Sequence, residues 1–462
     1  MIVKVLLLKH FLTTMNKLAL EPYIWNRKYE SMPREELCEV QKNRLIRCVE
    51  RAYEHIPFYK QKLDAVGVHP SHIHSVENIS LLPFTTKADL RNQYPFGMFT
   101  VQMDSIIRLH ASSGTTGKPT VVGYTRNDLN LWSELTARAL AASGAKPGII
   151  IQNTYGYSLA TGGLGFHYGI ERIGATVVPA SGSSPQRNLT LLQDFSSGII
   201  LSTPSYIYSI SEVAENEGID LRSLPVAAGI FGAESWSEAL RHDIEKRWNI
   251  VAYNTYGLSE VIGPGVAHEC PHQVGLHIYE DHFIPEIINP ETGERMEEGI
   301  YGELVLTTIT KEAVPLIRYR TGDITRLFYE PCTCGRTLVR MDRVKGRIND
   351  LIRIGNKTLF PTEIEDVLLT SPDIKPHYQI VIEDNTNLID DIEIWVEVSD
   401  SVWQEKALFV QLEQQLTFNI KHHLGIAIKV KLMPPHSLPR SEGKAKRLVN
   451  KNQVKYSPIS RQ

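Results

Sequence analysis

A glycine- and hydroxyl-rich turn that ends in lysine carries the first chemical signal of this sequence. It comprises Ser112, Ser113, Gly114, Thr115, Thr116, Gly117 and Lys118, and Pro119 follows. Small residues let backbone N–H groups approach phosphate oxygens, the hydroxyls add donors, and the lysine adds positive charge. The turn therefore suits the phosphates of a nucleotide. It is not a Walker loop, because too few residues separate its glycines and no Ser or Thr follows the lysine.

The position of this turn favours the phosphate-binding interpretation. Residues 105–110 read as a strand, and residues 121–124 read as its hairpin partner. An ordinary surface loop can have the same composition, so the turn alone does not decide the function.

Three further segments combine residue types that nucleotide chemistry needs. Tyr256 and Gly257 precede Glu260, so an aromatic ring suited to a base stands near a carboxylate suited to hydrated Mg²⁺. Asp323 ends an arginine-rich segment, and its carboxylate can accept hydrogen bonds from two ribose hydroxyls. Lys444 lies in a basic, glycine-anchored loop. Each segment alone is equally well explained as a turn, a surface ion pair or a solvated tail.

Cysteine and histidine residues form a second chemical pattern. Cys332 and Cys334 lie one residue apart, and Cys270 lies upstream with His277. Two neighbouring thiolates plus a distant Cys and His can close a tetrahedral zinc site. We favour these four residues as ligands, with His272 as a rival ligand and free buried thiols as the alternative. Such a zinc site is structural, because protein ligands fill all four positions.

Composition restricts the classes of partner. The 462 residues exceed what a single hydrophobic core usually supports, so at least two domains are expected. The balance of 49 basic and 52 acidic residues gives no general attraction for nucleic acid or an anionic membrane. No apolar run reaches transmembrane length. Lysines interrupt the apolar run at residues 1–9, so it does not read as a signal peptide. Met15 is an alternative start of the protein. Five cysteines, an odd number, suit a reducing compartment, so we predict a cytoplasmic protein.

Hydrophobic patterning predicts an α/β N-terminal part. A long amphipathic helix is expected over residues 35–63. Short apolar runs read as buried strands separated by helices such as 237–248; these runs are 149–152, 175–178, 198–202 and 226–231. The alternation over residues 302–308 predicts a half-exposed strand of an appended sheet.

The pattern changes after about Gly346. Strands are expected at 378–382, 392–398 and 428–432, with a helix over 403–424. These elements form a compact α+β unit. We therefore predict two domains, residues 1–346 and residues 347–462.

Taken together and in this order, the motifs resemble the adenylate-forming superfamily of acyl-CoA synthetases, adenylation domains and luciferases. Segments 161–169, 231–234 and 280–283 are similar to the phenylacetate-CoA ligase family, and the resemblance runs from about Trp25 to Arg447. It implies a large multi-subdomain α/β N-terminal domain and a small mobile α+β C-terminal domain. It also implies two half-reactions: an aromatic acid and ATP give acyl-AMP and pyrophosphate, and coenzyme A then takes the acyl group.

The resemblance also assigns roles to individual positions. Lys444 would bridge the carboxylate and the α-phosphate, Glu260 would bind Mg²⁺, and Arg347 would contact phosphate. The residues implied to bind the nucleotide are Ser112 to Lys118, Gly232, Ala233, Glu234, Asn254, Tyr256, Gly257 and Asp323. Asn349 falls at the position of the hinge.

The resemblance implies an acid pocket around residues 155–163 and behind residues 232–234. Its expected lining is Tyr155, Tyr157, Gly162, Gly163 and Phe166, which would accommodate an aryl or arylacetic acid. Core packing explains the aromatic residues equally well. The expected cofactors and co-substrates are ATP, Mg²⁺, coenzyme A and structural Zn²⁺, without nucleic acid or membrane and with a homodimer left open.

The sequence departs from the family pattern at three places: the first bears on the hinge, the second on the adenine contact and the third on the acceptor. Asn349 replaces the usual acidic hinge residue, Asn254 replaces an acidic residue two positions before Tyr256, and Gly355–Asn356 replaces an Arg–Gly pair in a region that lines the thiol entry path of relatives. A carrier-protein thiol or an amine is therefore an alternative acceptor. A non-catalytic nucleotide sensor is a third hypothesis, which an intact Lys444, Glu260 and Asp323 disfavour.

Overall fold

The computed structural model describes residues 20–112, 118–354, 357–382, 392–440 and 445–451. The chain forms two compact units, each built from discontinuous segments. Unit 1 comprises Met1–Ser202, Ser223–Ala233 and Val251–Arg343. Unit 2 comprises Thr203–Arg222, Glu234–Ile250 and Val344–Gln462.

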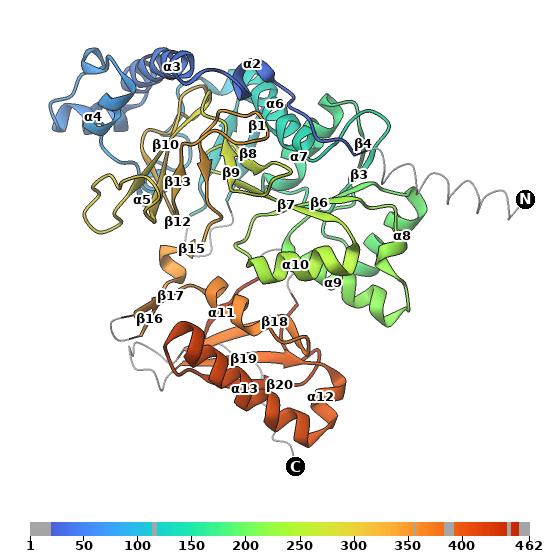
Figure 1. Cartoon of the computed structure of the whole chain (residues 1–462). Helices are drawn as coiled ribbons and strands as arrows, with labels where there is room; N and C mark the ends of the chain where they lie inside the picture. Colours follow the sequence, from blue (N-terminus) through green and yellow to red (C-terminus); the bar gives the residue numbers. More distant parts are fainter. Residues whose placement is uncertain (1–19, 113–117, 355–356, 383–391, 441–444, 452–462) are drawn as a thin grey trace, which may run out of the picture. The chain divides into compact units, whose positions relative to one another are not determined.

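A nine-stranded sheet forms the centre of unit 1 (Figure 1). Its order is β13-β14-β9-β8-β7-β6-β5-β3-β4. Strands β4, β3, β5, β6 and β7 run parallel, and the others pair antiparallel. The bounds are β3 Ile150–Asn153, β4 Thr176–Val178, β5 Ile199–Ser202, β6 Ala228–Gly232, β7 Val251–Leu258, β8 Gly263–Glu269, β9 Leu276–Ile278, β13 Leu327–Phe328 and β14 Arg340–Met341.

The short apolar runs of the sequence are confirmed as strands of this sheet, but the prediction that all are buried is wrong for the run at 175–178, because β4 lies at the sheet edge and Thr176 is exposed. Strand β5 is buried at every residue, as is β6. Parallel strands covered on both faces need apolar residues throughout, which is why these runs show no alternation. The predicted α/β class thus follows from the residues themselves.

Helices of unit 1 pack closely where glycines permit it. Helix α6 begins at a capping box in which Thr125 Oγ1 accepts from the Asp128 backbone N–H at 3.1 Å. A Cβ on Gly165 of α7 would meet the Trp132 ring of α6 at 2.4 Å, so glycine is what lets the two helices approach. The helix bounds are α2 Arg27–Glu30, α3 Arg34–His55, α4 Pro57–Ala65, α5 Lys87–Asn92, α6 Arg126–Ala142, α7 Gly162–Arg172 and α8 Pro185–Phe195, with 3₁₀ turns at Pro70–His72, Val76–Leu81 and Met103–Ser105.

The single helix predicted over residues 35–63 is wrong. The structure has two helices, α3 and α4, separated at Ile56, which is extended at φ −114° and ψ 105°. Pro57 takes the first position of α4, and its ring keeps the preceding residue out of the helical region.

A second sheet and a hairpin complete unit 1. Strands β10 (Phe283–Ile288), β11 (Gly302–Thr308) and β12 (Tyr319–Thr325) pair antiparallel. The prediction that residues 302–308 are half-exposed is wrong, because all seven are buried. The alternation gave the wrong result because the charged residue Glu303 is buried. Its carboxylate accepts from Arg320 Nε at 2.9 Å. Strands β1 (Arg108–Ala111) and β2 (Val121–Tyr124) form the predicted hairpin, with β1 starting after the 3₁₀ turn at 103–105.

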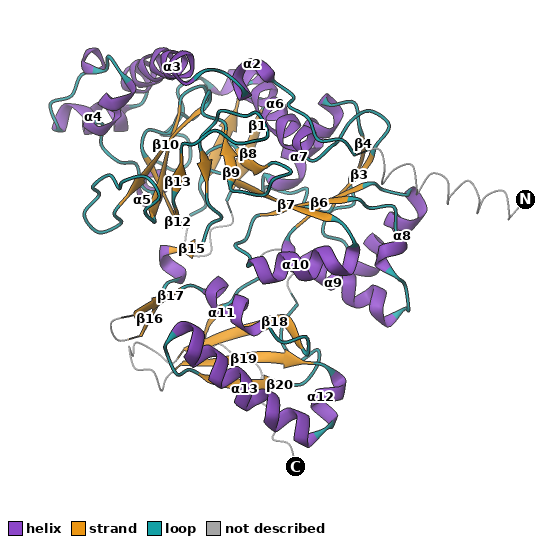
Figure 2. Ribbon diagram, in the orientation of Figure 1, coloured by secondary structure: helices purple, strands orange, loops and turns teal. Residues whose placement is uncertain are grey.

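Unit 2 has its own sheet, of order β20-β19-β18-β21, in which β18 and β19 are antiparallel and the outer pairs are parallel (Figure 2). Ile380, Ile394 and Leu416 lie in its core, none of them exposed. The bounds are β15 Gly346–Arg347, β16 Ile352–Ile354, β17 Lys357–Leu359, β18 Ile374–Ile382, β19 Ile392–Val398, β20 Lys429–Met433, β21 Leu448–Asn450, α9 Pro204–Asn216, α10 Glu238–Trp248, α11 Pro361–Leu368, α12 Asp400–Gln404 and α13 Lys406–Leu424.

Two helix predictions in unit 2 have different outcomes. Helix α10 is confirmed, with Ser237 as N-cap accepting from the Leu240 backbone N–H at 3.1 Å. The helix predicted over residues 403–424 is wrong at its start. Glu405 is extended, at φ −98° and ψ 109°, and separates α12 from α13.

An ionic cluster joins segments of unit 2 that lie far apart in the sequence. Glu212 of α9 lies 3.1 Å from His377 Nε2, 3.6 Å from Lys375 Nζ and 3.1 Å from Arg440 Nε. Burial raises the pKa of Glu212, but the surrounding cations outweigh burial and lower it to about 2. The carboxylate is therefore ionised at neutral pH, with its partners in place.

Candidate active site

Two of the predicted nucleotide motifs meet directly in unit 1. The Tyr256 hydroxyl, on β7, donates to Asp323 Oδ2, on β12, at 2.6 Å. Asp323 is only 3% exposed, and its own backbone N–H donates to Thr321 Oγ1 at 3.1 Å. The structure thus fixes the carboxylate predicted for ribose beside the ring predicted to flank the base.

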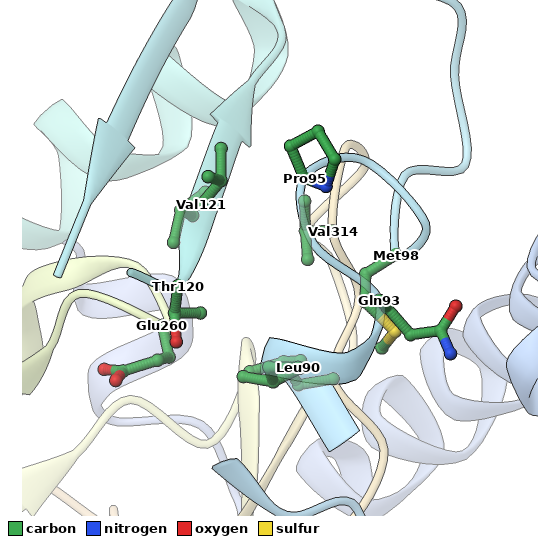
Figure 3. A pocket seen from close by; sticks show the side chains of 10 residues that line it. Leu90, Gln93, Pro95, Met98, Thr120, Val121, Glu260 and Val314 are labelled. Atoms are coloured by element: carbon green, nitrogen blue, oxygen red, sulfur yellow. The ribbon is translucent and has the colours of Figure 1, made fainter. Parts of the chain in front are cut away.

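Glu260 follows β7 and lines a pocket of unit 1. Its carboxylate is 6% exposed, and Lys87 Nζ, from the first residue of α5, lies 3.2 Å from Glu260 Oε1. Thr120, two residues after the turn predicted to bind phosphate, lines the same pocket (Figure 3). The remaining lining is Leu90, Gln93, Pro95, Met98, Val121, Val122, Val314 and Leu316.

Only Ser112 and Lys118, the two ends of the turn predicted to bind phosphate, belong to the described residues. Ser112 and Thr120 close the turn, because the Ser112 backbone N–H donates to Thr120 O at 3.0 Å and the Thr120 backbone N–H donates to Ser112 Oγ at 3.2 Å. Lys118 is exposed, with its Nζ 5.5 Å from the centre of the Tyr94 ring. The predictions for residues 113–117 lie outside the described residues.

The residues predicted to border the adenine follow the end of β6. A Cβ on Gly232 would lie 2.3 Å from Thr255 O, so only glycine fits there, and Ala233 has φ 72°. The Asn254 backbone N–H donates to Glu269 Oε2 at 2.6 Å. In unit 2, Glu234 accepts from the backbone N–H groups of Ser205 and Ala445, both at 2.7 Å.

Gly257 has a packing role that its motif did not indicate. A Cβ there would lie 2.0 Å from Gly263 O, so the close pairing of β7 with β8 requires a glycine. Its predicted contact with the nucleotide stays a prediction.

The predicted acid-pocket residues divide into two groups. Tyr155 and Phe166 stack on each other, with ring centres 5.7 Å apart, inside the hydrophobic core of unit 1. Tyr157 is half-buried, and its hydroxyl accepts from Asn153 Nδ2 at 2.9 Å. Burial raises the pKa of Tyr157 to about 12, so its hydroxyl is neutral.

The glycines of this region shape the backbone around Tyr155. A Cβ on Gly163 would lie 2.6 Å from Gly156 O, and one on Gly162 would lie 3.3 Å from Tyr155 Cβ. Contact of these two glycines with an acid remains a prediction. The same holds for the contacts predicted for Tyr155, Tyr157 and Phe166.

Three of the predicted residues belong to the C-terminal part of the chain. Lys444 lies outside the described residues. Arg347 is half-buried on β15, and Asn349 is exposed in a 3₁₀ turn at Ile348–Asp350, both in unit 2. Their roles stay predictions.

The four favoured zinc ligands come together in unit 1. The donor atoms of Cys270, His277, Cys332 and Cys334 all lie within 4.8 Å of one another. Cys270 Sγ lies 3.7 Å from Cys332 Sγ, and Cys334 Sγ lies 3.6 Å from His277 Nε2. A zinc tetrahedron with Zn–S of about 2.3 Å and Zn–N of about 2.0 Å has S···S edges of about 3.8 Å and S···N edges of about 3.5 Å. The donor set therefore fits zinc.

The exposure of His272 and the surroundings of Cys334 also support these four residues as the ligands. His272 is exposed and does not belong to the cluster. Hydrogen bonding with Cys270 and the neighbouring His277 hold the pKa of Cys334 well below its usual range. Arg336 Nη1 donates to Cys334 Sγ at 3.6 Å, which further favours a thiolate.

Sequence reasoning missed two lysines near Glu260. Lys87 belongs to no motif, and its pairing with Glu260 spans 173 positions (260 − 87). Lys311 is 3% exposed and donates from Nζ to Val261 O at 2.9 Å. The sequence offered one signal for Lys311, which is a charged residue in a segment rich in strands. A lysine buried in such a segment needs a specific partner.

Comparison with known proteins places this geometry in a family. The AMP-binding enzyme family model matches residues 34–310, and the model of the AMP-binding enzyme C-terminal domain matches residues 356–452. Phenylacetate-coenzyme A ligase from Thermus thermophilus is 47% identical over 428 residues, which cover 90% of this chain and 96% of the relative. The chain belongs to the phenylacetate-coenzyme A ligase family of adenylate-forming enzymes.

A second relative and a solved structure agree with that assignment. Phenylacetate-coenzyme A ligase from Escherichia coli is 45% identical over 419 residues, covering 90% of this chain and 94% of that protein. A crystal structure of 2-hydroxyisobutyryl-CoA ligase in the postadenylation state matches with a TM-score of 0.88 and 26% identity, covering 93% of this chain and 92% of that one. The predicted family and fold class are confirmed. Within the described part of the chain, no helix is both long and apolar enough to cross a membrane.

Proposed function

We propose that this chain converts an aromatic carboxylic acid, ATP and coenzyme A to an aryl-CoA thioester, AMP and pyrophosphate. Family membership makes it an AMP-forming acid–CoA ligase, with ATP and coenzyme A as substrates. The observation that carries the proposal is the Tyr256–Asp323 pair, because it joins the base-flanking and ribose-binding motifs at 2.6 Å.

The first half-reaction forms acyl-AMP. A carboxylate oxygen of the acid attacks the α-phosphorus of ATP, the bond from that phosphorus to the bridging oxygen breaks, and pyrophosphate leaves. Two anions must meet in this step, so a cation between them removes repulsion and stabilises the charge that develops at phosphorus. We assign that role to Lys444, and the predicted phosphate contacts to Ser112, Lys118 and Arg347.

The second half-reaction transfers the acyl group. The thiol sulfur of coenzyme A attacks the acyl carbon, the thiol proton is released, and the bond to the AMP oxygen breaks. No covalent enzyme intermediate is needed, so the protein contributes positioning and electrostatics. Asp323 and Tyr256 would hold the nucleotide in both half-reactions.

Glu260 is the residue we assign to Mg²⁺. A buried carboxylate beside the end of the phosphate-binding turn has the oxygen donors that Mg²⁺ prefers. When bound, the ion neutralises phosphate charge and orients the leaving pyrophosphate. Lys87, which neutralises Glu260 in this structure, would then have to release the carboxylate.

The aromatic specificity is proposed for the region of Tyr157, Gly162 and Gly163. The glycines are held close to Tyr155 and Gly156, and the half-buried Tyr157 ring offers an apolar face with a fixed, neutral hydroxyl. A flat ring suits such a surface better than a branched chain.

We also propose that Cys270, His277, Cys332 and Cys334 hold a structural zinc ion. The ion would join the segment after β8 and strand β9 to the loop between β13 and β14. Its four protein ligands leave no position for a substrate.

The division into domains 1–346 and 347–462, with Asn349 as hinge, remains our proposal. Asn349→Pro fixes φ and removes a donor, so it should block one half-reaction selectively. Equal, wild-type rates in both half-reactions would move the hinge elsewhere. A cytoplasmic location and a homodimer likewise stay predictions, and size-exclusion chromatography tests the latter.

The proposed function is tested with a panel of aryl, arylacetic and aliphatic acids. Acid-dependent ATP–pyrophosphate exchange reports adenylation, and thioester formation with coenzyme A reports transfer. Lys444→Ala should abolish exchange but retain thioester formation from supplied acyl-AMP. Exchange without a thioester would instead indicate a carrier-protein or amine acceptor, and no exchange with any acid would favour the sensor.

A further inference from the structure

A second hollow of unit 1, distinct from the pocket of Glu260, is lined by arginines. Its volume is about 320 Å³, within the range of roughly 300–1,000 Å³ typical of small-molecule sites. One wall is helix α3, and the other is the segment that follows β11. Its lining is Arg44, Arg47, Cys48, Arg51, Ile309, Thr310, Lys311 and Glu312.

The three arginines share one face of α3. Arg44, Arg47 and Arg51 are spaced three and four positions apart, which places neighbouring side chains together on a helix. Like charges at this spacing repel, so the cluster destabilises the helix slightly unless an anion joins it. Cys48, buried on α3, joins this helix to the end of β11, because its thiol donates to Thr308 O at 3.0 Å.

Carboxylates of the protein do not neutralise Arg47 or Arg51, the two outer members of this cluster. Within the described part of the chain, neither Arg47 nor Arg51 has an ion-pair partner, although Glu50 and Glu54 lie on the same helix. Arg47 Nε donates only to a backbone oxygen, that of Asn43, at 3.1 Å. The two guanidinium groups are exposed, so a ligand from solution can reach them.

The other charged groups of the hollow are already engaged. Arg44 donates to the backbone oxygen of Asp281 and lies 3.9 Å from its carboxylate. Lys311 Nζ donates to Val261 O, and the Glu312 carboxylate accepts from Thr125 Oγ1 at 2.8 Å and Asn127 Nδ2 at 3.0 Å. Glu312 therefore does not compete for the arginines.

We propose that this hollow binds a phosphate-bearing anion through Arg47 and Arg51, with Arg44 adding charge. Guanidinium groups bind phosphate through paired N–H donors, and a cluster of them on a rigid helix loses little freedom on binding. The ligand is either a free polyphosphate or a nucleotide, and in both cases its phosphate groups contact the arginines. This site is independent of the proposed acid-activating chemistry, since none of its residues has a role there.

Calorimetric titration of the full chain, without ATP or acid, tests the proposal when the number of sites is fitted, so that binding at the proposed active site is counted separately. The probes are inorganic pyrophosphate and adenosine 3′,5′-bisphosphate. Arg47→Gln with Arg51→Gln should weaken binding of at least one probe about tenfold or more, because two charge-assisted contacts are lost. The control pair, Arg126→Gln with Arg187→Gln, removes the same charge from exposed positions of unit 1 and should change nothing.

The pattern of loss identifies the source of the phosphate. Weaker binding of pyrophosphate alone indicates a free polyphosphate, and weaker binding of the bisphosphate alone indicates a nucleotide. Thermal unfolding gives a second readout: the Gln pair should unfold at the wild-type temperature or slightly above it without ligand. A folded Gln pair that binds both probes like the wild type overturns the proposal.

Discussion

The cysteine–histidine cluster and the surroundings of Glu260 both lie in unit 1, and they treat their polar groups in opposite ways. In the cluster, four donor atoms face one another, and three of the four residues are buried. At Glu260, a buried carboxylate faces the lysine Lys87, whose side chain is 41% exposed. The first arrangement is complete within the protein, whereas the second depends on a partner that can leave.

This difference distinguishes the proposed structural centre from the proposed reactive one. A donor set that fills every position of its ion holds loops together and takes no part in turnover. A carboxylate with one replaceable counter-ion can exchange that partner for a metal ion and substrate phosphate. Changes at the cluster should therefore alter stability, and changes near Glu260 should alter the use of MgATP.

The largest effect is expected at the cluster. Cys332→Ser with Cys334→Ser should remove about one zinc ion per chain and lower the free energy of unfolding by about 4 kcal/mol or more, because metal binding contributes to folding. Elemental analysis and thermal unfolding measure both quantities. His272→Ala is the matched control and should retain metal and stability. Wild-type protein that is free of metal would contradict the assignment.

A smaller effect, on catalysis, is expected at Glu260. Glu260→Gln keeps the shape of the side chain but removes its charge, so the MgATP concentration needed for half-maximal pyrophosphate exchange should rise about 100-fold, or about 2.7 kcal/mol. The requirement for the acid should change little, and zinc content should not change. A variant in which only the affinity for the acid changes would show that Glu260 does not serve the metal.

Lys311 should give the region of Glu260 a pH-dependent stability. Burial lowers the pKa of Lys311 to about 8, although the charges of Asp128 and Glu260 oppose this shift. The unfolded lysine, with its higher pKa, binds more protons between pH 8 and 10.5, so the Lys311 contribution to stability rises with pH across that window.

The expected size of this effect is on the order of 1 kcal/mol between pH 7 and 9. It is measured as the difference in unfolding free energy between wild type and Lys311→Met, since other groups titrate equally in both. A difference that does not change with pH would mean that Lys311 remains charged in the folded chain.

The smallest effect is expected at Lys87. Lys87→Met removes the counter-ion that Mg²⁺ must displace from Glu260, so the magnesium concentration for half-maximal exchange should fall about two- to fivefold, as a partly exposed ion pair is worth about 0.2–1 kcal/mol. Lys60→Met, which breaks an exposed pair with Asp64, is the control. A rise in the magnesium requirement would instead make Lys87 a phosphate ligand.

The sequence predicted those parts of the fold that depend on local pattern. The runs at 199–202 and 228–232 could be recognised as strands because parallel strands are buried on both faces. Ser237 indicated the start of a helix, because serine is a favoured N-cap residue. Ile56 and Glu405 were missed as helix breaks, since both interrupt otherwise continuous helical periodicity.

Long-range pairing was the limit for the site. The cysteine cluster could be predicted because its residue types are rare and chemically specific, and the structure favours His277 over His272. Lys87 could not be connected with Glu260, because lysine is common on surfaces and only the folded chain brings the two together. The burial of the strand at 302–308 was missed for the same reason, since Glu303 finds its partner Arg320 on another strand.

The spacing of two sulfurs in the cluster has a consequence for how the protein survives oxidation. Cys270 and Cys332 hold their Sγ atoms 3.7 Å apart, and a disulfide bond needs about 2.05 Å. If the cluster holds the proposed zinc ion, a shift of less than 2 Å would let air join these two thiols once a chelator has removed that ion. The disulfide would then block the proposed site, so reducing agent and zinc would both be needed to refill it.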